Sequence, residues 1–150
     1  MRLMTIKRIV VGIDFSDGSD VAMEQALSLA AVFKATVDIV HVLDPIVLRP
    51  VATSGVASLA DAPALVDQID RALASRATKA AELGVACQTK LLEGHPAQEI
   101  VEYANKTGAD MIVVGTHGRT GIQHAVLGSV AERVVQRSTC PVVVIPRPRA

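Results

Sequence analysis

Aromatic side chains are scarce in this chain, which has 2 Phe, 1 Tyr and no Trp among its 150 residues. Hydrophobic residues nevertheless make up 50% of the sequence. The core therefore has to be built from Val, Ile, Leu and Ala, the composition of parallel sheets that are covered on both faces. A chain of this length buries about 70% of the surface that its unfolded form exposes. We expect a single domain over residues 1–150.

The chain also has only 2 cysteines and a formal net charge of zero. Cys87 and Cys140 are too few for a disulfide framework or a zinc site, so we expect two reduced thiols packed as small apolar groups. The 15 basic and 15 acidic residues cancel, unlike the charge of a nucleic-acid binder. No stretch approaches the roughly 20 apolar residues of a membrane span, and the apolar run 9–11 is too short for a signal peptide. We expect a cytoplasmic protein without nucleic-acid or membrane partners.

Strand-like and helix-like periods alternate along the chain. This alternation predicts an α/β fold, with a parallel sheet, right-handed crossovers and helices on both faces. The expected strands are 9–13, 36–43, 85–92, 110–115 and 141–146, and the expected helices are 17–34, 63–83, 96–107 and 126–137. Ser16 or Asp17 is expected to cap the first helix, and Gly84 and Gly108 to end two others.

One connection is unusually long. Residues 45–62 contain two prolines and a glycine and show no clean period, so we expect a long loop that is functional or partly packed. Residues 146–150 are expected to form a frayed tail.

The most informative feature is a set of glycines after the expected strand 110–115. Gly115 and Gly118 follow that strand, and Gly128 and Ser129 stand near the start of a helix. Glycine lets backbone N–H groups approach an anion, and a helix start adds unpaired N–H donors and partial positive charge. The glycines could also be plain turn residues and Ser129 an ordinary helix-start residue. Gly128 costs up to about 1 kcal/mol relative to alanine near a helix start, which favours a compensating close approach by a phosphate.

A second candidate loop follows the first expected strand. In open α/β sheets, ligands lie beyond the carboxyl ends of the strands, where the strand order reverses. Asp14 is either a helix cap or a ligand for ribose hydroxyls or a cation such as Mg²⁺. Arg119 is placed to neutralise phosphate charge or is merely solvated, and His117 lies in the same loop. His41, in an apolar run, is expected to be a core histidine rather than a ligand.

Catalytic motifs are missing from the same sequence. There is no G-x-x-x-x-G-K-[ST] segment and therefore no P-loop lysine, and the first strand-to-helix turn lacks G-x-G-x-x-G. No Ser-His-Asp set or carboxylate pair stands out. The sequence predicts a means of holding phosphates without an evident apparatus for cleaving them.

The motifs together resemble the ATP-binding members of the universal stress protein family. That subgroup shares the pattern G-x2-G-x9-G-[ST], which this chain matches with Gly115, Gly118, Gly128 and Ser129. The resemblance covers essentially the whole chain. The segments that carry it are 9–16 (IVVGIDFS), 113–121 (VVGTHGRTG), 127–134 (LGSVAERV) and 140–144 (CPVVV).

The resemblance implies an open, Rossmann-like five-stranded parallel sheet of order 3-2-1-4-5, with ATP held between the first and fourth strand loops. Asp14 would contact the ribose, the backbone of Val42 would meet adenine, and Arg119 would flank phosphates and ribose. Gly12 departs from the bulkier residue or proline common in relatives. Taken together, the predicted ATP-binding residues are Gly12, Ile13, Asp14, Val42, Gly115, Thr116, His117, Gly118, Arg119, Gly128, Ser129 and Val130, and Asp14 is also the candidate ligand for Mg²⁺.

The resemblance also implies a homodimer in which the fifth strands pair across a two-fold axis. The strand residues are Val142, Val143, Val144 and Ile145. Sequence composition agrees independently, because an apolar edge strand that is left uncovered would be an aggregation hazard.

Three functions follow as hypotheses. The first is an ATP-binding stress-response regulator with no hydrolysis or very slow hydrolysis. The second is a Mg²⁺-dependent nucleotide hydrolase or nucleotidyl transferase that uses Asp14 and His117. The third is an interaction protein that keeps the fold but works without a nucleotide.

Overall fold

The computed structural model describes residues 1, 3–48, 62–117 and 127–147. Its centre is one parallel sheet in the order β3-β2-β1-β4-β5, which confirms the expected α/β class and strand order. The order reverses between β1 and β4. The strands are β1 (Arg8–Ile13), β2 (Thr36–Leu43), β3 (Cys87–Glu93), β4 (Met111–Gly115) and β5 (Val142–Ile145).

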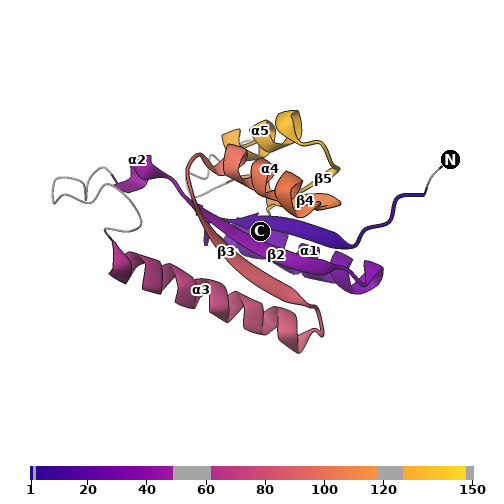
Figure 1. Ribbon diagram of the computed structural model, residues 1–150, viewed down its shortest axis with the longest axis horizontal. Coiled ribbons are helices and arrows are strands. Elements are labelled where there is room, and N and C mark those ends of the chain that lie inside the picture. Colours follow the sequence, from indigo (N-terminus) through magenta and orange to yellow (C-terminus); the bar gives the residue numbers. More distant parts are fainter. Residues whose placement is uncertain (2, 49–61, 118–126, 148–150) are drawn as a thin grey trace.

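Helices cover both faces of the sheet. Figure 1 shows α3 on one side of the strands and α4 with α5 on the other. Helix α1 packs into the same core as α3. Right-handed crossovers of a parallel sheet produce this double winding. The helices are α1 (Asp17–Phe33), α2 (Pro45–Leu48), α3 (Pro63–Glu82), α4 (Pro96–Thr107) and α5 (Ser129–Arg137).

Two hydrophobic cores lie on the two sides of the sheet. Successive strand residues point to opposite faces, so Ile9 joins the core under α1 and α3 while Val10 joins the core under α4 and α5. Both residues are completely buried. The strand therefore reads as an unbroken apolar run, as expected where both faces are covered.

Local signals place several helix ends as predicted. The Oγ of Ser16, the N-cap of α1, accepts a hydrogen bond of 3.2 Å from the backbone N–H of Ser19. Gly84 and Gly108 follow α3 and α4 with φ angles of 69° and 66°, the left-handed conformation that glycine adopts without steric cost. The predicted cap and both terminating glycines are confirmed.

Two boundaries differ from the prediction. Helix α5 begins at Ser129 with the extended residue Gly128 as its N-cap, so the expected start near Val126 is wrong; Val126 itself lies outside the described residues. The connection 45–62 is not all loop, because Pro45–Leu48 forms the short helix α2. Residues 49–61 lie outside the described part of the chain.

The C-terminal tail is partly described. Carbon Cγ and nitrogen Nε of Arg147 each lie 3.7 Å from the point that a Cβ on Gly18 would occupy. The side chain of Arg147 therefore lies against the first turn of α1. Residues 148–150 are outside the described residues.

A polar cluster sits toward the amino ends of the strands. Asp38 of β2 is 1% exposed. Its Oδ1 accepts a hydrogen bond of 2.9 Å from Gln88 Nε2, its Oδ2 accepts one of 3.0 Å from the Tyr103 hydroxyl, and Arg8 Nε lies 3.9 Å from Oδ2. Burial first, and then the neighbouring Asp38 carboxylate, raise the pKa of Tyr103 to about 12. The buried carboxylate is therefore supplied with donors on both oxygens.

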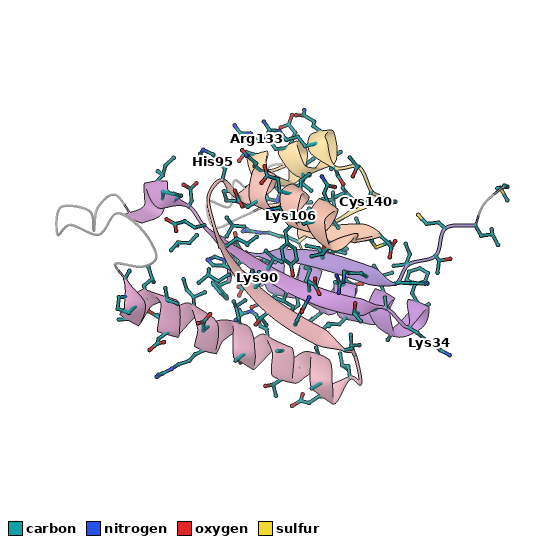
Figure 2. All side chains as sticks on the ribbon, in the orientation of Figure 1. Lys34, Lys90, His95, Lys106, Arg133 and Cys140 are labelled. Carbon is teal, nitrogen blue, oxygen red and sulfur yellow. The ribbon has the colours of Figure 1, made fainter. Side chains whose placement is uncertain are left out.

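The two cysteines are free thiols, as predicted. Cys140 lies just before β5 (Figure 2). Burial, and then Asp38, raise the pKa of Cys87 to about 11. Across the described ranges, no helix has both the length and the apolar character required to cross a bilayer.

Candidate functional site

The two predicted loops meet at the carboxyl edge of the sheet. Strands β1 and β4 are parallel neighbours, so their carboxyl ends lie side by side. A Cβ on Gly115, at the end of β4, would lie 3.2 Å from the carbonyl oxygen of Gly18 in α1. A Cβ on Gly18 would lie 3.5 Å from the carbonyl oxygen of His117. The start of α1 and the loop after β4 are therefore packed backbone against backbone.

Side-chain hydrogen bonds organise the loop after β1. Asp14 Oδ1 accepts a bond of 3.0 Å from the N–H of Ser16 and a further bond from the Ser16 hydroxyl. Ser19 Oγ accepts a bond of 3.2 Å from the N–H of Asp14 and donates one of 3.0 Å to the carbonyl of Ser16. Asp14 is thus not the N-cap, one of the two alternatives left open by the sequence. Instead, its carboxylate binds Ser16, which is the N-cap of α1.

Backbone hydrogen bonds organise the loop after β4. The N–H of Thr116 donates to the carbonyl of Ile145 over 3.0 Å, and the carbonyl of Thr116 accepts from the N–H of Gly128 over 2.7 Å. A Cβ on Gly128 would lie 2.6 Å from that carbonyl oxygen. Sequence reasoning explained Gly128 by the approach of a phosphate. The structure supplies an internal reason instead, since the backbone of Thr116 leaves no space for a side chain.

The amino end of α5 has no side-chain cap, because its N-cap is Gly128. In α1 the equivalent position is Ser16, whose hydroxyl binds a backbone N–H. Helices α3 and α4 also have no side-chain cap, but they begin with Pro63 and Pro96, so the first residue of each has no N–H. The first N–H groups of a helix, together with its dipole, form a binding place for an anion. Helix α5 presents this place next to exposed Ser129.

His117 packs against the N-cap of α5, since its Cα lies 3.4 Å from the point that a Cβ on Gly128 would occupy. Its Nδ1 lies 3.0 Å from Thr116 Oγ1. Its Nε2 is buried and has no hydrogen-bond partner within the described part of the chain. Buried polar atoms normally have a partner, so a ligand or a water is expected to complete this nitrogen.

The remaining predicted contacts lie deeper in the strands. Gly12 and Ile13 pair with Val40 and His41 of β2, and Val42 is 8% exposed in the core under α4 and α5. A Cβ on Gly12 would lie 2.6 Å from Ile100 Cδ1. In this chain, therefore, the end of the Ile100 side chain fills the space that a bulkier residue at position 12 would need.

His41 is a satisfied core histidine, as expected. It is 8% exposed, and its Nδ1 lies 2.8 Å from the carbonyl oxygen of Ile13. A carbonyl oxygen only accepts hydrogen bonds, so Nδ1 carries the proton.

Part of the predicted site cannot be placed. Gly118 and Arg119 lie outside the described residues. Within the described ranges, no three His, Cys, Asp or Glu side chains gather as a metal-binding group.

Three residues at this edge were missed by sequence reasoning. They are Ser19, which braces Asp14, Phe15, which has a positive φ, and Ile100, which fills the space at Gly12. Ser19 could have been found, since it stands three residues after the N-cap. Nothing local marks Phe15 or Ile100.

The fold and the two loops define an open α/β protein with its candidate site at the reversal of strand order. The chain belongs to the universal stress protein family, whose model matches residues 5–146. Among curated proteins it is similar to the universal stress protein MJ0531 of Methanocaldococcus jannaschii. The two are 42% identical over 147 residues, which cover 95% of this chain and 84% of the relative.

Solved structures agree with this assignment. The structure of MJ0577, a universal stress protein of Methanocaldococcus jannaschii, matches 99% of this chain and 100% of its own with a TM-score of 0.85 and 26% identity. A universal stress protein in complex with cAMP matches with a TM-score of 0.70, 28% identity and coverage of 95% and 98%. The universal stress protein from Archaeoglobus fulgidus in complex with dAMP matches with a TM-score of 0.69 and 25% identity, and the match covers 95% of this chain and 99% of that one. Some structural neighbours therefore bind nucleotides.

Proposed function

We propose that this protein binds ATP between the loops after β1 and β4 and acts as a nucleotide-dependent regulator of the stress response. The observation that carries the proposal is the amino end of α5, which lacks a side-chain cap and packs against the backbone of His117, a residue whose Nε2 is buried. An anion at this end would accept hydrogen bonds from the first N–H groups of α5 and would be stabilised by the helix dipole. Family members with bound cAMP and dAMP support a nucleotide as the source of that anion.

The described groups of the site are suited to holding a nucleotide. The α5 start and Ser129 would bind phosphate oxygens, Asp14 would accept a bond from a sugar hydroxyl, and Val42 would adjoin the base. Mg²⁺ would join Asp14 to phosphate oxygens, since carboxylate and phosphate oxygens are its usual ligands. The described side chains offer binding donors and one carboxylate rather than an oriented nucleophile and base. We therefore propose occupancy of the site, and not turnover, as the signal.

Substitution of Ser129 tests the proposal. Ser129→Asp places a carboxylate where the phosphates would bind, and we expect the Kd for ATP to rise at least about tenfold through like-charge repulsion. The same carboxylate should stabilise α5 through the dipole by about 0.5 kcal/mol, so weaker binding cannot be blamed on unfolding. Ser129→Asn, which is uncharged, is the control. Unchanged affinity in Ser129→Asp would refute the site.

Mass spectrometry of the ligand released from freshly purified protein identifies the nucleotide. ATP is the expected species. Recovery of another nucleotide would revise the ligand. Turnover in the per-second range that His117→Ala abolishes would instead support the hydrolase or nucleotidyl transferase. Absence of measurable ATP binding would favour the interaction protein.

We also propose that two copies pair through β5. The two edges of the sheet differ, because β3 carries the exposed polar residues Gln88, Thr89 and Lys90 whereas β5 reads VVVI. Figure 2 shows Lys90 on β3. Charged residues on an edge discourage strand pairing, and an apolar edge invites it. The second copy would cover the apolar edge.

A proline at Val144 tests this pairing. Carbonyls of Pro141 and Ile145 accept bonds of 3.0 Å from the β4 side. Because backbone groups alternate between the sides of a strand, the N–H of Val144 faces the open edge. Val144→Pro removes that donor without removing a bond to β4. We expect monomers from Val144→Pro and dimers from the Val144→Ala control by analytical ultracentrifugation. Dimers from both variants would contradict pairing through β5.

A further inference from the structure

Phe15 has a backbone conformation that is unfavourable for a bulky residue. Its φ is 65°, in the left-handed region. For residues other than glycine, this region is costly and is normally occupied only where the surroundings enforce it. Phe15 stands between Asp14 and Ser16, and the hydrogen bonds from Ser16 to Asp14 Oδ1 span it. The conformation of Phe15 therefore sets how the Asp14 carboxylate meets its neighbours.

Two side chains from distant elements hold the Phe15 ring. The ring centroid lies 4.5 Å from that of His41 of β2, with the planes tilted by 42°. The guanidinium carbon of Arg76, from α3, lies over the ring at 4.7 Å from its centroid. Aromatic pairs and cation–π contacts of this geometry are attractive.

Both partners of the ring are themselves fixed. Arg76 binds Asp20 of α1 through two bonds, 2.7 Å from Nε to Oδ1 and 3.0 Å from Nη2 to Oδ2. A planar, two-bond pair of this kind restricts the orientation of the guanidinium. His41 is anchored through Nδ1 to the carbonyl of Ile13. The ring of Phe15 therefore contacts two side chains whose orientations are fixed by their own hydrogen bonds.

We infer that Phe15 is a positioning residue for the candidate nucleotide site. Its ring, held by Arg76 and His41, keeps the backbone left-handed and so orients the Asp14 carboxylate toward a sugar hydroxyl of the ligand. Arg76 acts on the ligand only through Phe15. This inference rests on the proposed nucleotide-binding function, and it adds to the site a contribution from α3, an element remote from both loops in sequence.

Two substitutions of Phe15 separate the backbone from the ring. Phe15→Ala and Phe15→Gly both remove the ring, but only glycine adopts a positive φ without cost. We expect the Kd for ATP to stay within about twofold of wild type in Phe15→Gly and to rise about fivefold in Phe15→Ala. The usual order of the two residues is the reverse, since glycine is the more flexible. Equal affinities, or tighter binding by Phe15→Ala, would overturn the inference.

Arg76 supplies a second, independent test through a double-mutant cycle. Arg76→Met should weaken ATP binding in the wild-type background, because the ring loses a partner. It should have no further effect in Phe15→Gly, which needs no ring to stay left-handed. Equal weakening in both backgrounds would show that Arg76 acts otherwise and would overturn the inference. This cycle also stands if Phe15→Ala proves too unstable to assay.

The sugar readout distinguishes positioning from general destabilisation. The preference for ATP over 2′,3′-dideoxy-ATP should fall in Phe15→Ala and persist in Phe15→Gly, whereas a structural defect alone would weaken both nucleotides equally. Unfolding in urea shows that each variant is folded under the assay conditions. Failure of wild type to bind ATP would overturn the proposed function. Normal binding with no difference between the variants would overturn only the role of Phe15.

Discussion

Polar groups gather at both ends of the sheet, but among the described residues their hydrogen bonds are complete at one end and incomplete at the other. Toward the amino ends of the strands, the buried carboxylate of Asp38 receives bonds from Gln88 and Tyr103 and lies near Arg8. At the carboxyl ends, the start of α5 has no side-chain cap and His117 Nε2 has no partner in the described chain. A polar cluster whose hydrogen bonds are complete stabilises a fold, whereas a buried polar atom without a partner is suited to binding a ligand. The comparison teaches that polarity alone does not locate a site.

The largest expected loss of stability comes from a substitution in the Asp38 cluster, toward the amino ends of the strands. Asp38→Ala leaves the donors of Gln88, Tyr103 and Arg8 without their acceptor. We expect the free energy of unfolding to fall by about 3 kcal/mol, as when one partner of a buried ionic group is removed. Urea titration measures the loss. ATP affinity of the folded fraction should not change, and a large change would break the distinction between the two ends.

A smaller loss of stability is expected at the candidate site. In Gly128→Ala the new Cβ would stand 2.6 Å from the carbonyl of Thr116, and we expect a loss of about 2 kcal/mol with weaker ATP binding. Gly12→Ala is the matched control, because its Cβ meets the end of the Ile100 side chain at the same 2.6 Å. A side-chain end moves more easily than a backbone carbonyl. An equal cost in both variants by urea titration would contradict this explanation.

Substitutions at the starts of α1 and α5 should change stability by smaller amounts. Ser16→Ala removes the N-cap of α1 and should cost about 1 kcal/mol. Ser129→Ala, at the exposed start of α5, should change stability by less than about 0.5 kcal/mol but weaken ATP binding. Thermal unfolding with and without ATP measures both quantities. A similar stability loss in the two variants would mean that Ser129 is a structural residue after all.

The amino-end cluster also predicts a pH effect that is absent near neutrality. Folding raises the pKa of Tyr103 from its ordinary 10 to about 12, so the folded protein retains the phenolic proton longer than the unfolded chain does. The stability from this group is full below pH 10 and is lost as the pH rises toward 12. The chain has 1 Tyr, so ultraviolet titration reports Tyr103 alone. A midpoint near 10 in folded protein would contradict the cluster, and Asp38→Asn should lower the midpoint.

Much of this architecture was predictable from local sequence. The strand Thr36–Leu43, the cap Ser16 and the terminating glycines Gly84 and Gly108 were found because period and turn chemistry are properties of neighbouring residues. The start of α5 was missed by a few residues. Its apolar pattern extends back to Val126, whereas the extended conformation of Gly128 makes the helix begin later, at Ser129.

The site was predictable as a pair of loops but not in its internal contacts. Glycines and Asp14 marked both loops, and their meeting followed from the parallel sheet. The backbone hydrogen bonds of Thr116 could not be predicted from local sequence, because one of them is made to Ile145 of another strand. The ring contact between Phe15 and Arg76 likewise needs the fold to bring α3 to the loop after β1.

The sequence by itself determined the alternation of strands and helices, the apolar core and the glycine pattern that identifies the family. These features depend on spacing between near neighbours, which the chain carries before it folds. Tertiary structure alone decided why Gly128 must be glycine, what holds Phe15 left-handed and what satisfies Asp38. Each depends on atoms brought together from distant positions, as with Asp20 and Arg76, which are 56 residues apart. Only packing sets such distances.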